Sequence, residues 1–273
     1  MIHDPRPPDR RQEKYSKGRN ADSFNPSTTY CRPSMRVIHE PNTYRYPANI
    51  KSDDVIITPN FEPDPDLYQK LGAEIMDLQE QGVPDSEYIS WAVGTHLLVK
   101  NPQGSPTFRQ IIKHMCDYYD IDPNSIAVRY NMYKDDVDWK AFHNDSAAFN
   151  KERAERQNIT VGLSIGRTRE LAFKHGQNGT LIYMPMPSGT LYSFSKAVNI
   201  NWLHGINAIP PNEQTKHGRI SIIVWGSTRK LIKEPNEPRL LEDNDRRKVA
   251  SVCRDFKRGM CKWGDKCKFV HTS

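Results

Sequence analysis

Six short runs of β-branched and aromatic residues follow one another in the second half of the chain, each bounded by Gly, Pro, Asn or Asp. Runs of this length and composition are typical of β-strands. A series of short strands separated by turns favours a sandwich or a barrel. The runs are residues 126–133, 158–165, 170–175, 180–184, 190–194 and 219–225.

Two helical patterns precede these runs. After Asp64-Pro65-Asp66, apolar residues recur at helical spacing, and Ser105-Pro106 opens a second pattern of the same kind. The first stripe is Leu67, Leu71, Ile75 and Leu78, and the second is Phe108, Ile111, Ile112, Met115 and Tyr119. Val55–Ile57 and Tyr88–Val99 have the composition of strands. The chain is therefore predicted to be α+β.

The charge is concentrated at the two ends of the chain. Residues 1–50 carry nine Lys and Arg against five Asp and Glu, and residues 229–273 carry thirteen against seven, whereas the middle is acidic. Residues 1–50 also hold seven prolines and little apolar periodicity, which predicts a disordered tail. We expect a catalytic domain over 51–228, a charged linker over 229–250 and a small domain over 251–273. A polyanion partner is expected to be bound by the basic termini.

The positions of the cysteines and the hydropathy of the chain indicate the cellular compartment. No apolar run approaches the ~18 residues of a membrane span, and the first residues lack the apolar segment of a signal peptide. Three of the five cysteines lie in the last twenty-one residues, which indicates a metal site rather than a disulfide framework. We expect a soluble intracellular protein of the nucleus or cytoplasm.

A candidate metal site begins at His143 and Asp145. Two residues apart on an extended strand, they point to the same face and can share one cation. His204 follows sixty-one residues after His143, and Arg219 and Ser221 follow His204. Two imidazoles and one carboxylate leave three positions of an iron ion open, enough for a chelating 2-oxo acid and oxygen. A buried Arg219 would neutralise the far carboxylate of that acid.

In this arrangement, residues from about 55 to 228 resemble the AlkB-like branch of the Fe(II)/2-oxoglutarate-dependent dioxygenases. The resemblance implies a double-stranded β-helix (jelly-roll) core with flanking helices. It implies that iron is bound by His143, Asp145 and His204, which are then the catalytic residues. It also implies that 2-oxoglutarate is contacted by Asn131, Tyr133, Arg219 and Ser221.

The sequence departs from the family pattern at two positions. Trp225 stands where the family usually has a second arginine, so the metal-side carboxylate is recognised by another group such as Arg229, or by no second cation. Ala147 replaces the acidic residue that often helps to read a damaged base. The aromatic residues Trp139 and Phe142, just before the metal motif, either line a substrate pocket or belong to the core.

Simpler interpretations of the same histidines exist. His143 could be an ordinary loop histidine, and Asp145 could cap a helix through residues 147–149. His175 and His217 compete with His204 for the third ligand position, although their spacing suits the fold less well. Both are expected to be surface or turn histidines.

The C-terminus carries a second metal motif. Cys253, Cys261, Cys267 and His271, at spacings of x7, x5 and x3, form a ligand set suited to structural zinc and resemble the CCCH finger family. Members of that family mostly bind single-stranded RNA, which implies base stacking and phosphate contacts by intervening residues. These are Phe256, Lys257, Arg258, Trp263, Lys268 and Phe269. The alternative is a zinc-stabilised module for protein docking.

Together these features predict an oxygenase acting on nucleic acid, with RNA foremost and DNA second. By resemblance, oxygen and 2-oxoglutarate would be consumed to succinate and carbon dioxide as a substrate C–H bond is hydroxylated. An N-methyl group so hydroxylated collapses to formaldehyde and the free amine. Two alternatives stay open: a protein hydroxylase or demethylase in a nucleic-acid complex, and a non-catalytic RNA-binding adaptor.

Overall fold

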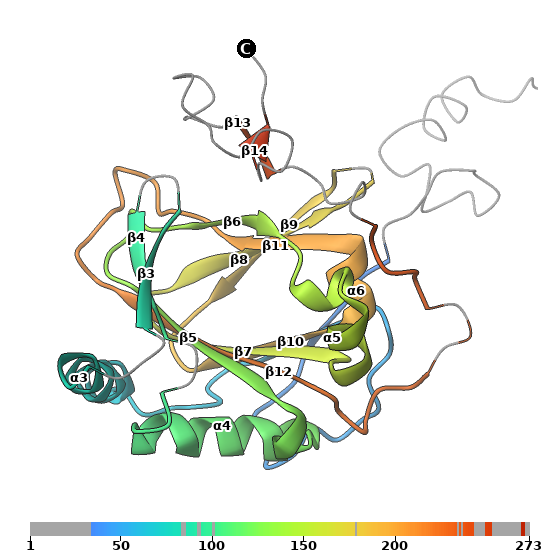
Figure 1. Ribbon diagram of the computed structural model, residues 1–273, viewed down its shortest axis with the longest axis horizontal. Coiled ribbons are helices and arrows are strands. Elements are labelled where there is room, and N and C mark those ends of the chain that lie inside the picture. Colours follow the sequence, from blue (N-terminus) through green and yellow to red (C-terminus); the bar gives the residue numbers. More distant parts are fainter. Residues whose placement is uncertain are drawn as a thin grey trace, which may run out of the picture. The chain divides into compact units, whose positions relative to one another are not determined.

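The computed structural model (Figure 1) describes residues 34–82, 86–91, 94–99, 102–177, 179–233, 235, 237–242, 249–252 and 269–270. Most of these residues belong to two facing β-sheets and the helices beside them. Among the described residues, no helix is both long and apolar enough to cross a membrane. The mixed α+β class predicted from the sequence is confirmed.

The larger sheet has eight strands in the order β1-β2-β10-β7-β12-β5-β4-β3. Their bounds are β1 Arg36–His39, β2 Asp54–Thr58, β3 Ser86–Trp91, β4 Gly94–Val99, β5 Ala127–Tyr133, β7 Ile159–Gly166, β10 Thr190–Ser195 and β12 Arg219–Gly226. The smaller sheet has the order β6-β11-β8-β9, with bounds β6 Lys140–His143, β8 Arg169–His175, β9 Leu181–Met186 and β11 Trp202–Ile206. A separate parallel pair joins β13 Val249–Val252 to β14 Phe269–Val270.

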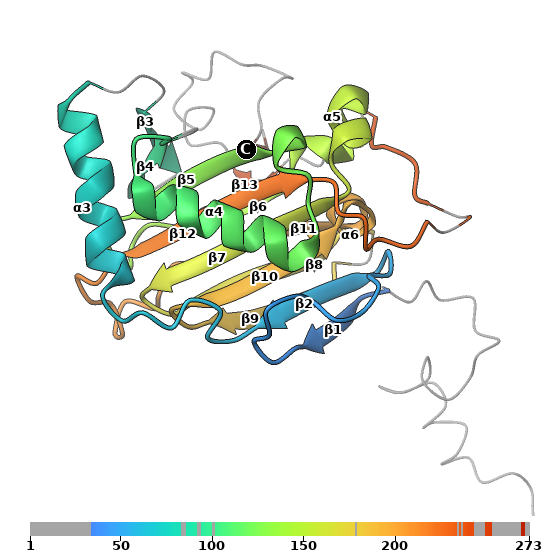
Figure 2. The same cartoon turned by 90° about the horizontal axis from the view of Figure 1, so that it is seen from below.

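Two long helices cover the outer face of the larger sheet (Figure 2), and both were predicted. They are α3, Leu67–Glu80, and α4, Pro106–Tyr119. The start of α4 is set by Ser105, whose Oγ accepts a hydrogen bond of 3.0 Å from the backbone N–H of Phe108. Shorter helices lie after β6 and β10: η2 Ser146–Ala148, α5 Lys151–Arg156 and α6 Lys196–Asn201, with η1 Pro123–Ser125 before β5.

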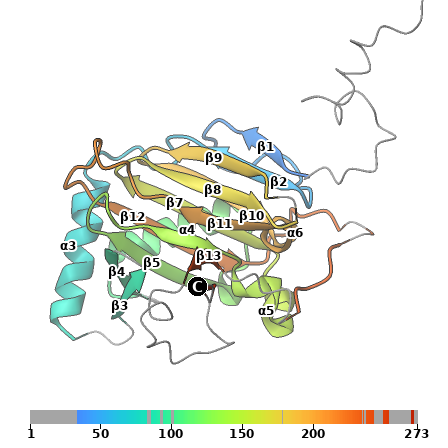
Figure 3. The ribbon, with the colours of Figure 1, turned by 90° about the horizontal axis from the view of Figure 1, so that it is seen from above.

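Successive side chains of the central strands point to opposite faces of the larger sheet, and this divides the hydrophobic core into two layers. On β7 and β12, every second residue packs against α3 and α4, and the residues between them face the smaller sheet. The helix-facing residues of these strands are Ile159, Val161, Leu163, Ile165, Ile220, Ile222 and Val224. The opposite layer, between the sheets, contains Phe173, Phe194, Trp202 and Ile223 among its buried residues. Figure 3 shows the smaller sheet lying over the larger one.

The chain passes repeatedly between the two sheets. From β5 to β12 the strands fall in the order larger, smaller, larger, smaller, smaller, larger, smaller, larger. This alternation brings strands that are distant in sequence, such as β5 and β12, into register as neighbours. It therefore places the ends of β5, β6, β11 and β12 around one space.

Two predicted boundaries differ from the structure. The predicted disordered tail extended to residue 50, yet β1 pairs in parallel with β2, and Tyr46 and Ile50 are buried in the core. The apolar residues of this segment are too widely spaced to show a period, so their burial could not be read from the sequence. The predicted linker also begins within the fold, because Ile50 bridges to Leu231. Residues 88–99, predicted as one strand region, form the antiparallel hairpin of β3 and β4.

Candidate metal centre

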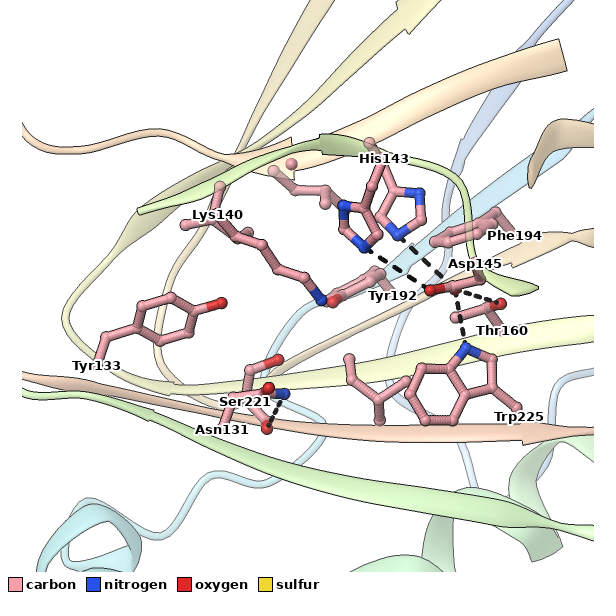
Figure 4. Close-up of a pocket in the computed structure, with 15 residues that line it drawn as sticks. Asn131, Tyr133, Lys140, His143, Asp145, Thr160, Tyr192, Phe194, Ser221 and Trp225 are labelled. Atoms are coloured by element: carbon pink, nitrogen blue, oxygen red, sulfur yellow. Dashed lines mark hydrogen bonds and ion pairs between the residues drawn. The ribbon is translucent and has the colours of Figure 1, made fainter. Parts of the chain in front are cut away.

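His143, Asp145 and His204 come together between the two sheets, as the sequence predicted. Figure 4 shows His143 and Asp145 on one side of the cavity. His143 ends β6 and lies directly opposite His204 on β11. The Nε2 atoms of both histidines lie 3.7 Å from oxygens of the Asp145 carboxylate. One ligand atom from each residue falls within 4.8 Å of the others, so these three side chains could hold a metal ion.

The simpler interpretations of these residues hold only for the position of Asp145 before a short helix and for the exposure of His217. Asp145 does occupy the N-cap position of η2, but its side chain makes no capping hydrogen bond. His175, expected at the surface or in a turn, is instead buried at the end of β8, where its ring packs edge-on against Trp202 with ring centroids 4.8 Å apart. His217 is exposed, and its Nδ1 lies 3.0 Å from Thr215 Oγ1. The third position of the cluster therefore belongs to His204.

Burial keeps both imidazoles neutral. It lowers the pKa of His204 to about 4 and the pKa of His143 well below its ordinary value, and the positive charge of Lys140 lowers both further. A neutral imidazole has a free ring nitrogen for a metal. His143 Nδ1 lies 2.9 Å from the carbonyl oxygen of Ala141, which can only accept, so the proton belongs on Nδ1 and Nε2 is left for a metal.

The carboxylate of Asp145 is fixed from the opposite sheet. The indole Nε1 of Trp225, on β12, donates to Asp145 Oδ2 at 2.8 Å, and the hydroxyl of Thr160 lies 3.3 Å from the same oxygen. Asn199 holds the backbone of Asp145 by accepting from its N–H at 2.8 Å and donating to its C=O at 3.1 Å. The residue that departs from the family pattern, Trp225, thus orients one of the three candidate ligands.

Arg219 is fully buried at the start of β12. Its Nε donates to Ser164 Oγ at 2.9 Å, but Nη1 and Nη2 have no hydrogen-bond partner among the described residues. Its guanidinium carbon lies 5.3 Å from the ring centre of Tyr133. Burying an unpaired guanidinium is costly, so this arrangement favours an anionic ligand beside it.

A cavity connects the three candidate ligands with the surroundings of Arg219. Asn131, Tyr133 and Ser221, predicted as cosubstrate contacts, all line it, and Asn131 Nδ2 donates to the carbonyl of Ser221 at 3.3 Å. Burial raises the pKa of Tyr133 to about 12, so its phenol stays protonated. The remaining lining residues are Lys140, Thr160, Leu171, Tyr192, Phe194, Gly205, Ile206, Ile223 and Trp225.

Lys140 and Tyr192 were not singled out in the sequence. Tyr192 lies on β10 opposite Gly162, where an added Cβ would come within 2.2 Å of the tyrosine Cζ. Gly162 therefore makes room for the ring. Arg229, considered as a second cation, is exposed and forms an ion pair of 3.3 Å with Asp120. That interpretation of Arg229 is wrong.

Three further residues discussed in the sequence lie outside the cavity lining. Ala147 is buried in η2, and Trp139 and Phe142 are partly buried but do not line the cavity.

Most of the predicted finger lies outside the described residues, namely Cys253, Cys261, Cys267, His271, Phe256, Lys257, Arg258, Trp263 and Lys268. Phe269 is described only by its backbone in β14.

Comparison with known proteins identifies the C-terminal motif. Residues 250–272 match the family model for zinc fingers of the C-x8-C-x5-C-x3-H type and similar fingers. No curated protein matches the chain. Among solved structures, a prolyl-4-hydroxylase from Pseudomonas putida is similar with a TM-score of 0.44 and 14% sequence identity. That alignment covers 64% of this chain and 92% of that one, a likeness too weak to assign an activity.

Proposed function

We propose that the chain is an Fe(II)- and 2-oxoglutarate-dependent dioxygenase of the AlkB-like type that hydroxylates or oxidatively demethylates RNA. In this proposal His143, Asp145 and His204 bind iron, and Arg219 binds the far carboxylate of 2-oxoglutarate. The C-terminal finger binds zinc and raises the local concentration of RNA. The single observation that carries the proposal is the buried guanidinium of Arg219, whose Nη1 and Nη2 have no hydrogen-bond partner among the described residues, beside the cavity that contains the His-Asp-His cluster.

The order of the strands supports a double-stranded β-helix. Strands β5, β12, β7 and β10 are neighbours in the larger sheet, and β6, β11, β8 and β9 are neighbours in the smaller one. Eight strands that alternate between two facing sheets are what a jelly roll requires. In this arrangement β6, the turn after it and β11 supply the candidate ligands, while β5 and β12 supply the residues around Arg219.

The residues around the cavity suit iron and a 2-oxo dicarboxylate. Two neutral imidazoles and one carboxylate leave open metal positions, and Arg219 offers an anion its Nη1 and Nη2 amino groups, which have no hydrogen-bond partner among the described residues. When bound, iron and 2-oxoglutarate supply the oxidation of a substrate C–H bond. The protein's own part is to orient Asp145 through Trp225, to keep both histidines neutral, and to exclude water with the apolar Phe194, Leu171 and Ile223.

RNA is proposed as the substrate because of features outside the cavity. The finger matched over residues 250–272 contains thiolate and imidazole ligands for zinc, with aromatic and basic residues between them. The two ends of the chain are basic, whereas the middle carries a net charge of −4 by the same count. This distribution favours attraction of a polyanion at the ends and chemistry in the middle.

The proposal is tested by metal and cosubstrate binding without oxygen. Purified full-length protein should bind Fe(II) and then 2-oxoglutarate, with a charge-transfer absorption band in the visible region. His143→Ala should lose the band, and His217→Ala, which changes an exposed histidine, should keep it. A folded, iron-loaded wild type without the band would leave a non-catalytic RNA-binding adaptor as the better description.

The substrate class needs a second experiment. Conversion of 2-oxoglutarate to succinate by the wild type should be stimulated by single-stranded RNA carrying N-methylated bases, with formaldehyde released in step. Cys261→Ser should weaken that stimulation and leave the unstimulated rate unchanged. Stimulation by ribonucleoprotein extracts but not by the RNA purified from them would instead indicate a protein substrate.

A further inference from the structure

Strand β6 contains an irregularity that changes which side chains reach the cavity. His204 pairs with His143 and Ile206 pairs with Lys140, so two steps along β11 correspond to three along β6. An extra residue of this kind is a β-bulge, which re-aims the side chains beside it. Without it, Lys140 and His143 would point to opposite faces. With it, both line the cavity.

The opposite strand is adapted to the bulge. Gly205, between His204 and Ile206, lies so close to β6 that an added Cβ would be 2.7 Å from the carbonyl oxygen of Lys140. The same Cβ would be 3.2 Å from the backbone nitrogen of Phe142. A residue with a side chain at 205 would therefore push the bulge away. Gly205 and the bulge together fix Lys140 on the side of the metal ligands.

Lys140 brings a cation into the cavity, and the charge of Arg219 acts on it from nearby. Its side chain runs into the cavity toward Tyr192 (Figure 4). Asp145 is the only carboxylate among the described residues that line the cavity, and Trp225 already donates a hydrogen bond to it. Burial lowers the pKa of Lys140 to about 8; Asp145 opposes this shift, whereas Arg129 and Arg219 add to it. The cavity thus has more positive charge than its own acidic group balances.

The two cations come from opposite sheets. Arg219 lies at the start of β12, beside Tyr133, whereas Lys140 lies on the same strand and the same face as His143. A divalent metal at the cluster would add further positive charge. An acid with two carboxylates, one at the metal and one at Arg219, would pass beside Lys140.

We propose that Lys140 is the second cationic anchor of the cosubstrate site and contacts the carboxylate of 2-oxoglutarate that lies next to the metal. This inference rests on the proposed function and assigns a role that neither Trp225 nor Arg229 fulfils. The indole N–H of Trp225 already donates a hydrogen bond to Asp145, and Arg229 lies on the surface. Lys140 supplies the charge from β6 instead of from β12.

The test is binding of two acids to the full-length protein loaded with Mn(II), which binds such sites without consuming oxygen. 2-Oxoglutarate and 2-oxopentanoate share the metal-side carboxylate, but only the first has a far carboxylate. Lys140→Met should weaken calorimetric binding of both acids by about the same factor, roughly tenfold or more. Lys140→Arg should restore part of it. Lys174→Met, on the smaller sheet but outside the cavity lining, is the matched control and should bind both acids like the wild type.

Two results would overturn the assignment. Unchanged affinity of Lys140→Met for 2-oxoglutarate would remove Lys140 from the site, and weakening confined to 2-oxoglutarate would move Lys140 to the far carboxylate with Arg219. Mn(II) affinity and the thermal midpoint of each variant show that the cluster and the fold are intact. Failure of the proposed function looks different, because the metal-loaded wild type would then bind neither acid.

Discussion

The two faces of the larger sheet are built from the same strands and have opposite chemistry. On β7 and β12, the face toward α3 and α4 consists of aliphatic residues, all of them buried. The face toward the smaller sheet carries Thr160, Ser164, Arg219, Ser221 and Trp225, with their polar groups directed at the cavity or at each other. Alternation at every second residue is enough to separate the two.

This separation assigns stability to one face and ligand binding to the other. The aliphatic face buries apolar surface and stabilises the fold without any ligand. The polar face carries the buried guanidinium of Arg219, whose Nη1 and Nη2 have no hydrogen-bond partner among the described residues, and this group favours the folded state only when an anion binds. Substitutions on the two faces should therefore change different measurable quantities.

Arg219→Met should give the largest effect. We expect affinity for 2-oxoglutarate to fall on the order of 1,000-fold, or ~4 kcal/mol, because the far carboxylate loses its buried cationic partner. Stability of the ligand-free protein should stay the same or rise, since a buried unpaired charge is removed. Titration of the Mn(II)-loaded protein and chemical denaturation measure the two quantities. Arg229→Met is the exposed control, and equal affinity in the two variants would contradict the assignment of Arg219.

Leu163→Ala should give the converse result. Leu163 is fully buried on the helix-facing side of β7, and its truncation leaves a cavity between the sheet and the helices. We expect a loss of about 3 kcal/mol in the free energy of unfolding. Metal and 2-oxoglutarate affinity, measured where the variant is folded, should match those of the wild type. A variant that keeps its stability but loses cosubstrate binding would show that the two faces are not independent.

Much of the fold could be predicted because the periodic spacing of apolar residues along strands and helices is visible in the sequence. The runs at 158–165 and 219–225 became β7 and β12, and both long helices were found from their apolar spacing. The ligand candidates were also found, since His143 and Asp145 lie close in sequence and His204 lies at a suitable interval. Strand β1 was missed because an exposed edge strand of four residues has no distinctive period.

What could not be predicted depends on contacts between the sheets or on broken periodicity. In the sequence, Trp225 was noted only because it replaces the second arginine of the family pattern. Its hydrogen bond to Asp145 could not be predicted, because that bond requires β12 to face the end of β6. Lys140 was not considered, since strict alternation would turn it away from His143, and only the bulge opposite Gly205 reverses this. Both residues act through geometry that no single strand contains.

Trp225→Phe should have a smaller effect than either substitution above. It keeps an aromatic ring under Arg129, whose guanidinium carbon lies 5.3 Å from the ring, but removes the N–H that holds Asp145 Oδ2. Residues that orient a metal ligand in this way typically contribute about 10- to 100-fold to metal affinity. Mn(II) titration should show a loss in that range, with little change in unfolding free energy. Metal affinity identical to that of the wild type would mean that Thr160 and Asn199 suffice to hold the carboxylate.

The smallest effect concerns pH and follows from burial of the two histidines. Their pKa values are lowered, to about 4 for His204, so both are neutral well below pH 6.5 and protons compete with a metal only near the lowered values. Between pH 8 and pH 6, Mn(II) affinity should therefore be almost constant. Two histidines of ordinary pKa would lose on the order of tenfold over the same range, because each becomes mostly protonated at pH 6. Titrations at pH 6, 7 and 8 distinguish these cases, and a tenfold loss at pH 6 would show that the cluster opens to water before the metal binds.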